Sequence, residues 1–339
     1  AAAERLMGMS SDPYESALKQ VVNSPNMYRE GVRRGLDAEI RCEGVKRVMV
    51  VGVGGSGIVG DIVAALLEGY EVFVHKGFDI PGYVGRETLM LAVSYSGETA
   101  ETLRAVSQAL GRGMNVVGVS TGGRLLNLLG WRNVVSVSTG FEPRFAVPEM
   151  TGVAYGLLCR VYGIDAGSFI ESVKALEDYL RGVEVSGFSD IAESLVNRTA
   201  VCVTHGHLRP AGLRHKAQLN ENAKHPAYCV EFPEACHNEV EGWTNLSRFA
   251  YLLLRSRFED PLVKEAFEWS VEYLSGRGGL FHEVVVGGES RAEELLKHLA
   301  FADLLSIFLA RRKDVNPFTL TTIPLLRPRI RKHGPKLPQ

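Results

Sequence analysis

The densest group of polar residues in this sequence is NENAK at 220–224, which ends a stretch with helical spacing. His237 follows inside the segment EACHN at 234–238. A carboxylate can move a proton between two adjacent carbons, and an imidazole can assist the opening of a sugar ring. Glu221 and His237 are therefore candidates for the acid–base chemistry of a sugar isomerisation. A solvated helix end and a hydrogen-bonded core histidine are the structural alternatives for these two residues.

A second polar segment, SYSGET at 94–99, follows a strand-like run at 88–93. It brings the hydroxyls of Ser94, Ser96 and Thr99 to the start of a helical pattern. Free backbone N–H groups at a helix N-terminus, together with hydroxyl groups, bind a phosphate without a lysine. One hydroxyl there would be an ordinary N-cap. Three hydroxyls at the carboxyl end of a strand, where α/β folds bind their ligands, favour a phosphate site.

The glycine-rich turn GVGGSG at 52–57 fits the pattern G-x-G-x-x-G, since a strand-like run precedes it and a helical pattern follows. In a dinucleotide-binding fold the second strand ends on an acid that binds the ribose. Here that strand ends at His75-Lys76, and the first acid beyond it is Asp79. The missing acid disfavours an NAD-dependent oxidoreductase. An NADP-dependent one that uses Lys76 stays an alternative, as does a turn that only packs a helix on a strand.

Three further residues have side chains that could take part in a site. Arg144 lies in an otherwise apolar segment before a helical stretch and could supply fixed charge to a phosphate or hydroxyl. A surface ion pair explains a lone arginine equally well. His205 and His207 alternate at the end of a strand-like run, but no third ligand lies in register with them, so we expect no metal there. We likewise expect no cofactor.

The segments that carry this chemistry lie at the ends of short apolar runs separated by helical patterns. In the first half these strand-like runs are 46–52, 70–75, 88–93, 115–119 and 133–137. The alternation restarts near the middle of the chain, with strand-like runs at 199–204, 228–232, 248–254 and 281–286. Short buried strands that alternate with helices indicate a parallel sheet covered on both faces. We therefore expect an α/β protein with two doubly wound halves.

The composition excludes several classes of function. The chain has 339 residues and a formal net charge of -1, so electrostatic binding of nucleic acid or of an acidic membrane is not expected. Its five cysteines form no C-x-x-C pair, which argues against a disulfide framework and a zinc site. No apolar run is long enough to span a membrane, and no signal segment is recognisable. We expect a cytoplasmic protein.

Five segments together resemble the archaeal bifunctional phosphoglucose/phosphomannose isomerases. They are GVGGSG at 52–57, SYSGET at 94–99, PR at 143–144, LNENAK at 219–224 and PEACHNEVEGW at 233–243, and they occur in the family's order. Each is weak alone, and together they are specific; the resemblance extends from about residue 45 to the end of the chain. This family belongs to the phosphoglucose isomerase superfamily. The resemblance implies two sugar-isomerase (SIS) subdomains, each a flavodoxin-like three-layer sandwich.

The resemblance also implies a role for each residue that matches a family motif. Six residues of the two turns would hold the substrate: Gly54, Gly55 and Ser56 along the sugar, and Ser94, Ser96 and Thr99 at the phosphate. Arg144 would stabilise the enediolate intermediate, and Glu221 would be the base that moves a proton between C1 and C2. His237 would open the ring, reaching the site from the neighbouring subunit of a homodimer.

The chain departs from the family pattern at two places. Cys236 stands where family members carry a histidine beside the ring-opening one. The family's C-terminal threonine–proline pair and lysine have no fixed register here; Thr322 is the candidate threonine, and Arg327 and Lys332 are the candidate cations. An arginine could hold a hydroxyl but would scarcely give up a proton.

We therefore expect a metal-independent isomerase that interconverts glucose 6-phosphate, fructose 6-phosphate and mannose 6-phosphate through a cis-enediol(ate). A non-catalytic sugar-phosphate-binding SIS protein is the alternative, which Glu221 and His237 disfavour. The expected parts of the chain are an N-terminal helical extension (1–44), a first, phosphate-binding SIS subdomain (45–165), a helical connector (166–195), a second SIS subdomain with the catalytic Glu and His (196–312), and a C-terminal tail that closes the site (313–339).

Overall fold

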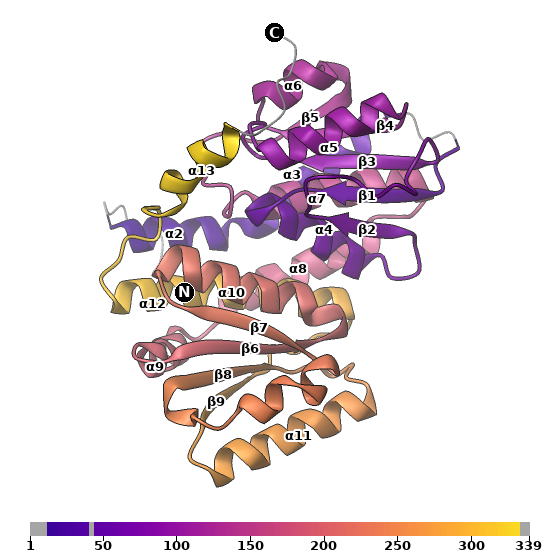
Figure 1. Ribbon diagram of the computed structural model, residues 1–339. Coiled ribbons are helices and arrows are strands. Elements are labelled where there is room, and N and C mark those ends of the chain that lie inside the picture. Colours follow the sequence, from indigo (N-terminus) through magenta and orange to yellow (C-terminus); the bar gives the residue numbers. More distant parts are fainter. Residues whose placement is uncertain (1–11, 41–43, 333–339) are drawn as a thin grey trace. The chain divides into compact units, whose positions relative to one another are not determined.

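The computed structural model describes residues 12–40 and 44–332 and divides into two compact units, shown in Figure 1. Each unit is described by itself. Residues 23–40, 44–170 and 320–332 form what we call the five-stranded unit, and residues 12–22 and 171–319 form the four-stranded unit. The helix α8 (Gly167–Gly182) begins in the first of these and continues into the second.

The sheet of the five-stranded unit is parallel throughout, with the strand order β2-β1-β3-β4-β5. Its strands are β1 (Arg47–Val51), β2 (Val72–His75), β3 (Thr88–Val93), β4 (Asn115–Ser120) and β5 (Val134–Ser136). The chain pairs β2 with one side of β1 and then crosses to place β3 on the other side. Ligands of α/β folds bind where the strand order reverses in this way. The reversal here lies between β1 and β3.

Helices cover both faces of this sheet because successive strand residues point to opposite sides. Met49 and Val51 pack with α5 (Ala100–Gly111) and α6 (Gly123–Leu129) in one apolar cluster. On the other face Val50 lies against Gly60 of α4 (Gly54–Leu66), and α4 packs on α7 (Val147–Tyr162). The remaining helices of this unit are α3 (Ser24–Asp37) and α13 (Ile323–Arg331), with the 3-10 turn η1 (Trp131–Asn133) before β5.

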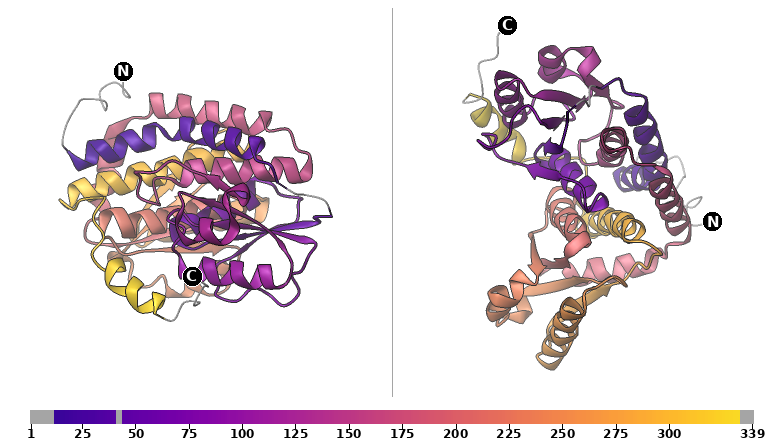
Figure 2. Two further views of the ribbon diagram at one scale, coloured as in Figure 1. Left: turned by 90° about the horizontal axis from the view of Figure 1, so that it is seen from above. Right: turned by 90° about the vertical axis from the view of Figure 1, so that its right-hand side faces the viewer.

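The helices α3 and α7 run side by side at very close range (Figure 2). Gly31 and Gly35 of α3 face Gly152 and Gly156 of α7, and a Cβ added to Gly31 would lie 2.2 Å from the carbonyl oxygen of Glu149. Only residues without a side chain allow two helix backbones to approach so closely. The two helices run parallel, so that Gly31 lies against the first turns of α7 and Gly35, near the end of α3, lies against Gly156.

The sheet of the four-stranded unit is also parallel, with the strand order β7-β6-β8-β9. Its strands are β6 (Thr199–His205), β7 (Ala227–Phe232), β8 (Phe249–Leu254) and β9 (Leu280–Val284). Its helices are α2 (Pro13–Val22), α9 (Val185–Leu195), α10 (Arg209–Ala223), α11 (Pro261–Gly276) and α12 (Arg291–Arg312), with short 3-10 turns at η2 (Gly206–Leu208), η3 (Glu234–His237), η4 (Glu239–Gly242) and η5 (Leu246–Arg248). One face packs on α11, while α10 covers the other face and packs on α12.

The two doubly wound parallel halves expected from the sequence are confirmed. Every expected strand is present, with bounds that differ by a few residues. The segment before residue 45 divides between the units: α2 packs on α12, whereas α3 packs on α7. The glycines that α3 and α7 share explain why α3 belongs with the five-stranded unit.

Candidate active site

The turn after β1 forms one wall of the crevice in the five-stranded unit. Gly54 has a φ of +59°, a conformation that favours glycine. A Cβ on Gly52 would lie 2.8 Å from the carbonyl oxygen of Val93 at the end of β3. A Cβ on Gly55 would lie 3.2 Å from the Cα of Arg144. The small residues of this turn thus let it approach both β3 and the arginine segment.

The Ser56 hydroxyl joins this turn to the one after β3. Ser56 is buried, and its Oγ accepts a hydrogen bond of 3.1 Å from the backbone N–H of Tyr95. Of the three residues predicted to line the sugar, Gly54 is exposed and Gly55 is half-buried. The backbone of these two glycines therefore forms the accessible part of the turn, and Ser56 braces it.

The turn after β3 carries the three predicted phosphate hydroxyls and brings two of them, those of Ser94 and Thr99, together. Ser94 Oγ donates to Thr99 Oγ1 at 3.0 Å, and the N–H of Glu98 donates to Ser96 Oγ at 3.2 Å. Gly97 has a φ of +66°, and a Cβ there would lie 1.9 Å from the carbonyl oxygen of Gly122. The Thr99 side chain does not cap α5. The first-turn N–H groups of that helix thus remain suited to an anion.

We call the turn after β3, residues 94–99, the phosphate turn, after its predicted role. It contains one carboxylate, whose charge is balanced locally. Glu98 accepts hydrogen bonds from the backbone N–H of Arg124 at 2.8 Å and from its Nε at 2.9 Å. This ion pair ties the turn to the start of α6 and holds the carboxylate in a fixed place. The negative charge of Glu98 is therefore screened from an anion bound at the start of α5.

Arg144 is a buried arginine that precedes α7. Its side chain is 2% exposed, its guanidinium lies 3.5 Å from the Glu142 carboxylate, and it stacks over the Phe145 ring at 5.5 Å. Packing of this kind fixes the position of a charged group far better than solvent exposure would. A held guanidinium can stabilise negative charge that develops on a bound oxygen.

The three candidate tail residues belong to one exposed helix. Thr322 is the N-cap of α13, Arg327 lies within it, and Lys332 is its C-cap. All three side chains are exposed. Within the described parts of the chain, none of them forms a hydrogen bond or ion pair with the turns after β1 and β3.

Glu221 lies in the last turn of α10, in the four-stranded unit. The helix ends at Lys224, which has a φ of +47°, and its ammonium donates to the carbonyl oxygens of Glu221 at 2.9 Å and Asn316 at 2.8 Å. Asn222 is buried and donates to Ser306 Oγ at 2.9 Å. These bonds fix the end of the helix, so that the half-buried Glu221 is presented from a rigid support.

His237 ends η3, on a turn anchored by its neighbours. Ala235 is buried and Cys236 packs against the core beneath α11, whereas His237 itself is exposed. Partial burial raises the pKa of the Cys236 thiol. Cys236 thus acts as a small apolar contact. The exposed imidazole of His237 is free to meet a ligand or a second subunit.

The residues that could have supported a dinucleotide site or a metal site are bonded or buried within the fold. The Lys76 ammonium forms an ion pair with the buried Asp61 carboxylate of α4, and Asp79 accepts hydrogen bonds from Arg104 and Gln108. His205 and His207 are buried, and burial lowers the pKa of His205 to about 4. Among the described residues, no three histidine, cysteine or acidic side chains are grouped as metal ligands would be.

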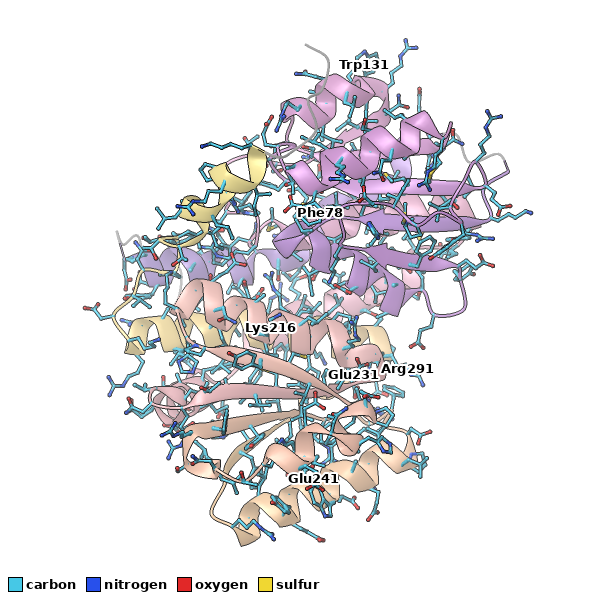
Figure 3. The ribbon with its side chains drawn as sticks, viewed as in Figure 1. Phe78, Trp131, Lys216, Glu231, Glu241 and Arg291 are labelled. Carbon is cyan, nitrogen blue, oxygen red and sulfur yellow. The ribbon has the colours of Figure 1, made fainter. Side chains whose placement is uncertain are left out.

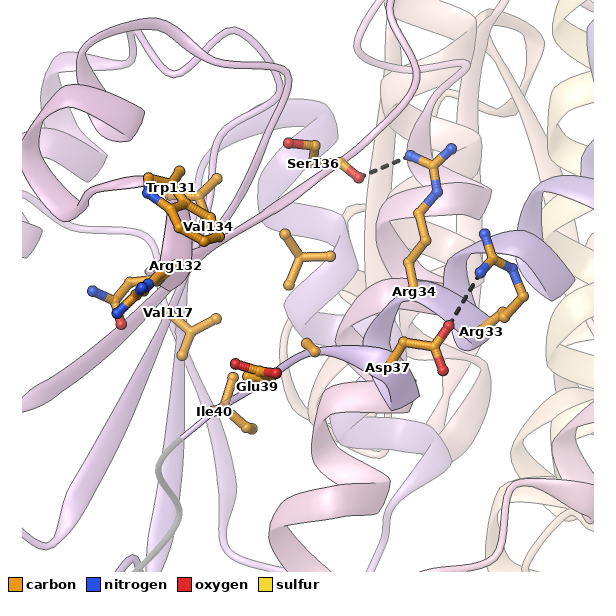
Figure 4. Close-up of a pocket in the computed structure, with 13 residues that line it drawn as sticks. Arg33, Arg34, Asp37, Glu39, Ile40, Val117, Trp131, Arg132, Val134 and Ser136 are labelled. Carbon is orange, nitrogen blue, oxygen red and sulfur yellow. Dashed lines mark hydrogen bonds and ion pairs between the residues drawn. The ribbon is translucent and has the colours of Figure 1, made fainter.

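A separate groove of about 530 Å³ lies along β5 in the five-stranded unit. The end of α3 forms one wall and Trp131, which projects from the surface (Figure 3), forms the other. Arg34 spans from α3 to the carbonyl oxygen of Ser136 at 2.8 Å (Figure 4). None of the residues predicted for the site lines this groove.

Sequence reasoning passed over two residues that support the site. Tyr95, inside the phosphate turn, and Glu149, at the start of α7, both bond to the loop that leads to Arg144. The position of Tyr95 between two predicted ligands was the only signal that sequence offered for it. Glu149 gave none, because its partners are distant along the chain.

Two family models match the chain. The SIS domain matches residues 40–123, and the bacterial phospho-glucose isomerase C-terminal SIS domain matches residues 186–330. A bifunctional phosphoglucose/phosphomannose isomerase of Aquifex aeolicus is 30% identical over 298 residues, covering 85% of this chain and 92% of that protein. One from Pyrobaculum aerophilum is 30% identical over 295 residues, covering 86% of this chain and 89% of that protein.

The fold is also similar to that of solved structures. The crystal structure of a hypothetical protein from Thermus thermophilus matches with a TM-score of 0.73 at 16% identity, covering 98% of this chain and 93% of that one. At this identity the likeness concerns the fold alone. None of the helices in the described part of the chain is both long and apolar enough to cross a membrane. On the strength of the sequence relatives, the chain belongs to the bifunctional phosphoglucose/phosphomannose isomerases, enzymes built from SIS domains.

Proposed function

We propose that this protein interconverts glucose 6-phosphate, fructose 6-phosphate and mannose 6-phosphate. The observation that carries the proposal is the group of three hydroxyls at the start of α5, beside the strand-order reversal of the five-stranded sheet. A hexose phosphate would be anchored there by Ser94, Ser96 and Thr99. The N–H groups at the helix N-terminus add to this binding because they favour an anion.

The chemistry begins with the opening of the sugar ring, which we assign to His237. The imidazole transfers a proton to the ring oxygen while the C1 hydroxyl loses one, leaving an open-chain aldose. In the proposed assembly His237 serves the site of the neighbouring subunit in a homodimer. An exposed imidazole on a short, anchored turn fits such a role.

The isomerisation itself we assign to Glu221. Its carboxylate removes the proton from C2 of the open aldose, which leaves an enediolate with its charge on O1. Return of that proton to C1 and transfer of the O2 hydroxyl proton to O1 then give the ketose. Arg144 stabilises the negative charge that develops on the enediolate oxygens. Glucose and mannose 6-phosphates differ only at C2, so turning the C2 face toward the same base would produce either one.

These groups suffice for the reaction as an acid–base sequence, so we propose that it needs no metal. The general base contributes about 10²–10⁴ in rate, and stabilisation of the enediolate adds a further electrostatic contribution. Thr322, with Arg327 or Lys332, remains the proposed contribution of the tail to selecting the sugar.

The test is turnover of the three hexose phosphates in EDTA by the wild type and by Glu221→Gln. The expected loss in the variant is about a hundredfold or more, since a general base is removed. Glu265→Gln, an exposed carboxylate on α11, is the matched control and should retain full activity. If the wild type binds hexose phosphates but turns none over, the catalytic assignment fails, and a sugar-phosphate-binding protein of the same fold takes its place.

A further inference from the structure

Tyr95 sits in the middle of the phosphate turn, yet its side chain leaves the turn and is buried. Its backbone joins the surrounding segments. The N–H donates to Ser56 Oγ at 3.1 Å, and the carbonyl oxygen accepts from both the N–H and the hydroxyl of Thr121 at 2.8 Å. One residue thus connects the turn after β3 to the turn after β1 and to the end of β4.

The phenol of Tyr95 reaches a third segment, the loop that leads to Arg144. Its hydroxyl donates to the carbonyl oxygen of Ser138 at 3.0 Å and accepts from the N–H of Phe141 at 3.0 Å. Burial raises the pKa of the Tyr95 phenol, so the hydroxyl remains a donor at neutral pH. Both bonding directions of the hydroxyl are therefore used on one loop.

The same loop is held from its other side by Glu149. This carboxylate is 2% exposed and accepts from the N–H and from the Oγ of Ser138, each at 3.0 Å. Arg34 of α3 pairs with it at 3.1 Å and also bonds to the carbonyl oxygen of Ser136, as Figure 4 shows. The position in the first turn of α7 suits a negative charge. Ser138 is thus clamped between Tyr95 and Glu149.

The clamp acts at a place where small displacements matter. Arg144 follows Phe141 by three residues, and its backbone comes so near the turn after β1 that a Cβ added to Gly55 would lie 3.2 Å from the Arg144 Cα. A shift of the loop would move the guanidinium relative to the phosphate turn. Misplacement of a reacting partner by about 1 Å can cost about a hundredfold in rate.

We propose that Tyr95 is a positioning residue that keeps Arg144 in register with the phosphate turn. This inference rests on the proposed function, because it takes Arg144 to stabilise the reaction intermediate. It gives the phosphate turn a second task. The turn binds the anion through its hydroxyls and sets the position of the arginine through the buried side chain of Tyr95.

The variant that tests this is Tyr95→Phe, which keeps the ring and the backbone bonds and removes the hydroxyl. We expect kcat for fructose 6-phosphate to fall about ten- to a hundredfold, while KM and the inhibition constant of inorganic phosphate change less than about threefold. Tyr162→Phe is the matched control, since it removes a single bond to the carbonyl oxygen of Glu71 in the same unit. Its kcat should equal that of the wild type.

A double-mutant cycle with Arg144→Met separates positioning from general support of the fold. If Tyr95 acts through Arg144, the kcat loss of Tyr95→Phe disappears in the Arg144→Met background. An equal loss in both backgrounds, or an unchanged kcat in Tyr95→Phe, overturns the inference. Glu149→Gln, which loosens the loop from its other side, should show the same non-additivity and replaces Tyr95→Phe if that variant does not fold.

The proposed function and this inference fail in different ways. A wild type without turnover overturns both. A wild type that turns over fructose 6-phosphate and loses activity in Glu221→Gln supports the proposed function, and the cycle then decides the role of Tyr95 by itself. Arg144→Met with full kcat would overturn the inference while leaving the proposed base untouched.

Discussion

The two sheets reverse their strand order at equivalent places, between β1 and β3 in one unit and between β6 and β8 in the other. The turns at these two crevices differ in chemistry. The first carries glycines, small hydroxyls and the N-terminus of a helix. The second carries His205 at the end of β6 with His207 just beyond it, and Arg255, Ser256 and Arg257 after β8. By residue type alone, the second crevice looks the better site for an anion.

The chain supplies that anion itself. Glu294, a buried carboxylate of α12, accepts bonds from the hydroxyl of Ser256 and from the N–H of Arg257, and lies 3.5 Å from His207 Nε2. Burial alone would raise the pKa of Glu294, but the nearby His207 imidazole and the hydrogen bonds from Ser256 and Arg257 outweigh burial and lower it. The donors of the second crevice are thus occupied by a carboxylate that belongs to the chain itself.

A second internal carboxylate completes this arrangement. Glu259 accepts two bonds from the Arg255 guanidinium, at 2.8 Å and 2.9 Å, and one from the N–H of Ser256 at 2.8 Å. In the five-stranded unit the acid of the equivalent turn, Glu98, is instead drawn aside by Arg124. The same strand-order reversal can therefore form a ligand site in one unit and an internal ion pair that stabilises the fold in the other. The outcome depends on whether a carboxylate of the chain already occupies the donors.

Of the single substitutions considered, removal of Glu294 should lower the stability of the four-stranded unit the most. In Glu294→Ala the buried His207 and the donors after β8 lose their partner, so we expect the free energy of unfolding of the four-stranded unit to fall by roughly 3 kcal/mol. Urea unfolding followed by the emission of the buried Trp243 measures this. Glu289→Ala removes an exposed ion pair with Arg257 and should cost less than about 1 kcal/mol. Equal stability of the two variants would contradict an internal anion.

A fall in pH should lower the stability of the four-stranded unit more than that of the five-stranded unit. Burial lowers the pKa of both His205 and His298 to about 4, below the ordinary value of 6.5. The unfolded chain therefore binds more protons than the folded one below pH 6.5, and stability falls as the pH drops from there toward 4. We expect a loss of about 2 kcal/mol per histidine between pH 7 and pH 5. In the described residues of the five-stranded unit, His75 is the only histidine.

The probe for this acid effect is tryptophan emission. Trp243 is buried in the four-stranded unit, whereas Trp131 of the five-stranded unit is already 73% exposed and reports little. Urea midpoints taken from the emission should fall steeply between pH 6.5 and pH 5 and change little between pH 7 and pH 8. Asparagine in place of His298 should weaken the dependence. A midpoint that does not vary with pH would show that these histidines can take up protons within the fold.

The parts of the site that the sequence predicted are those built from consecutive residues. The turns at 52–57 and 94–99 are local: a strand, a tight turn with glycines, and a helix start follow one another along the chain. Local sequence therefore indicates both the turn and the free N–H groups of the helix. The nine strands were predicted for the same reason, since each is a short apolar run between turn residues.

The parts that could not be predicted depend on distant partners. Tyr95 bonds to Ser138, and Glu294 bonds to Ser256, across long stretches of chain. Nothing in the residues near Glu294 distinguishes it from its neighbour Glu293, which pairs with Lys297 one turn further along the helix. Burial separates the two, and burial is a property of the packed fold. For the same reason, the sequence could not show that His205 and His207 are buried in the fold.

The smallest effect on stability is expected for Ser96→Ala in the first crevice. Unlike Glu294→Ala in the second crevice, this change should mainly weaken ligand binding. Its hydroxyl accepts one hydrogen bond, from the N–H of Glu98 in the same turn, so the loss in unfolding free energy should stay near 1 kcal/mol. Its loss as a donor to a charged phosphate should raise KM for fructose 6-phosphate about tenfold.

Two quantities are measured for Ser96→Ala, the free energy of unfolding and the KM for fructose 6-phosphate. Ser107→Ala, at an exposed position of α5, is the control and should change neither quantity. The donors of a ligand site are available to the ligand, so Ser96→Ala should lose affinity while its unfolding free energy falls by no more than about 1 kcal/mol. The inhibition constant of inorganic phosphate should rise by the same factor as KM. The reverse outcome, a destabilised unit with unchanged KM, would mean that the hydroxyls after β3 are satisfied within the fold, as the donors after β8 are. The two crevices would then differ only in which atoms of the chain satisfy their donors, and the phosphate would have to be bound elsewhere.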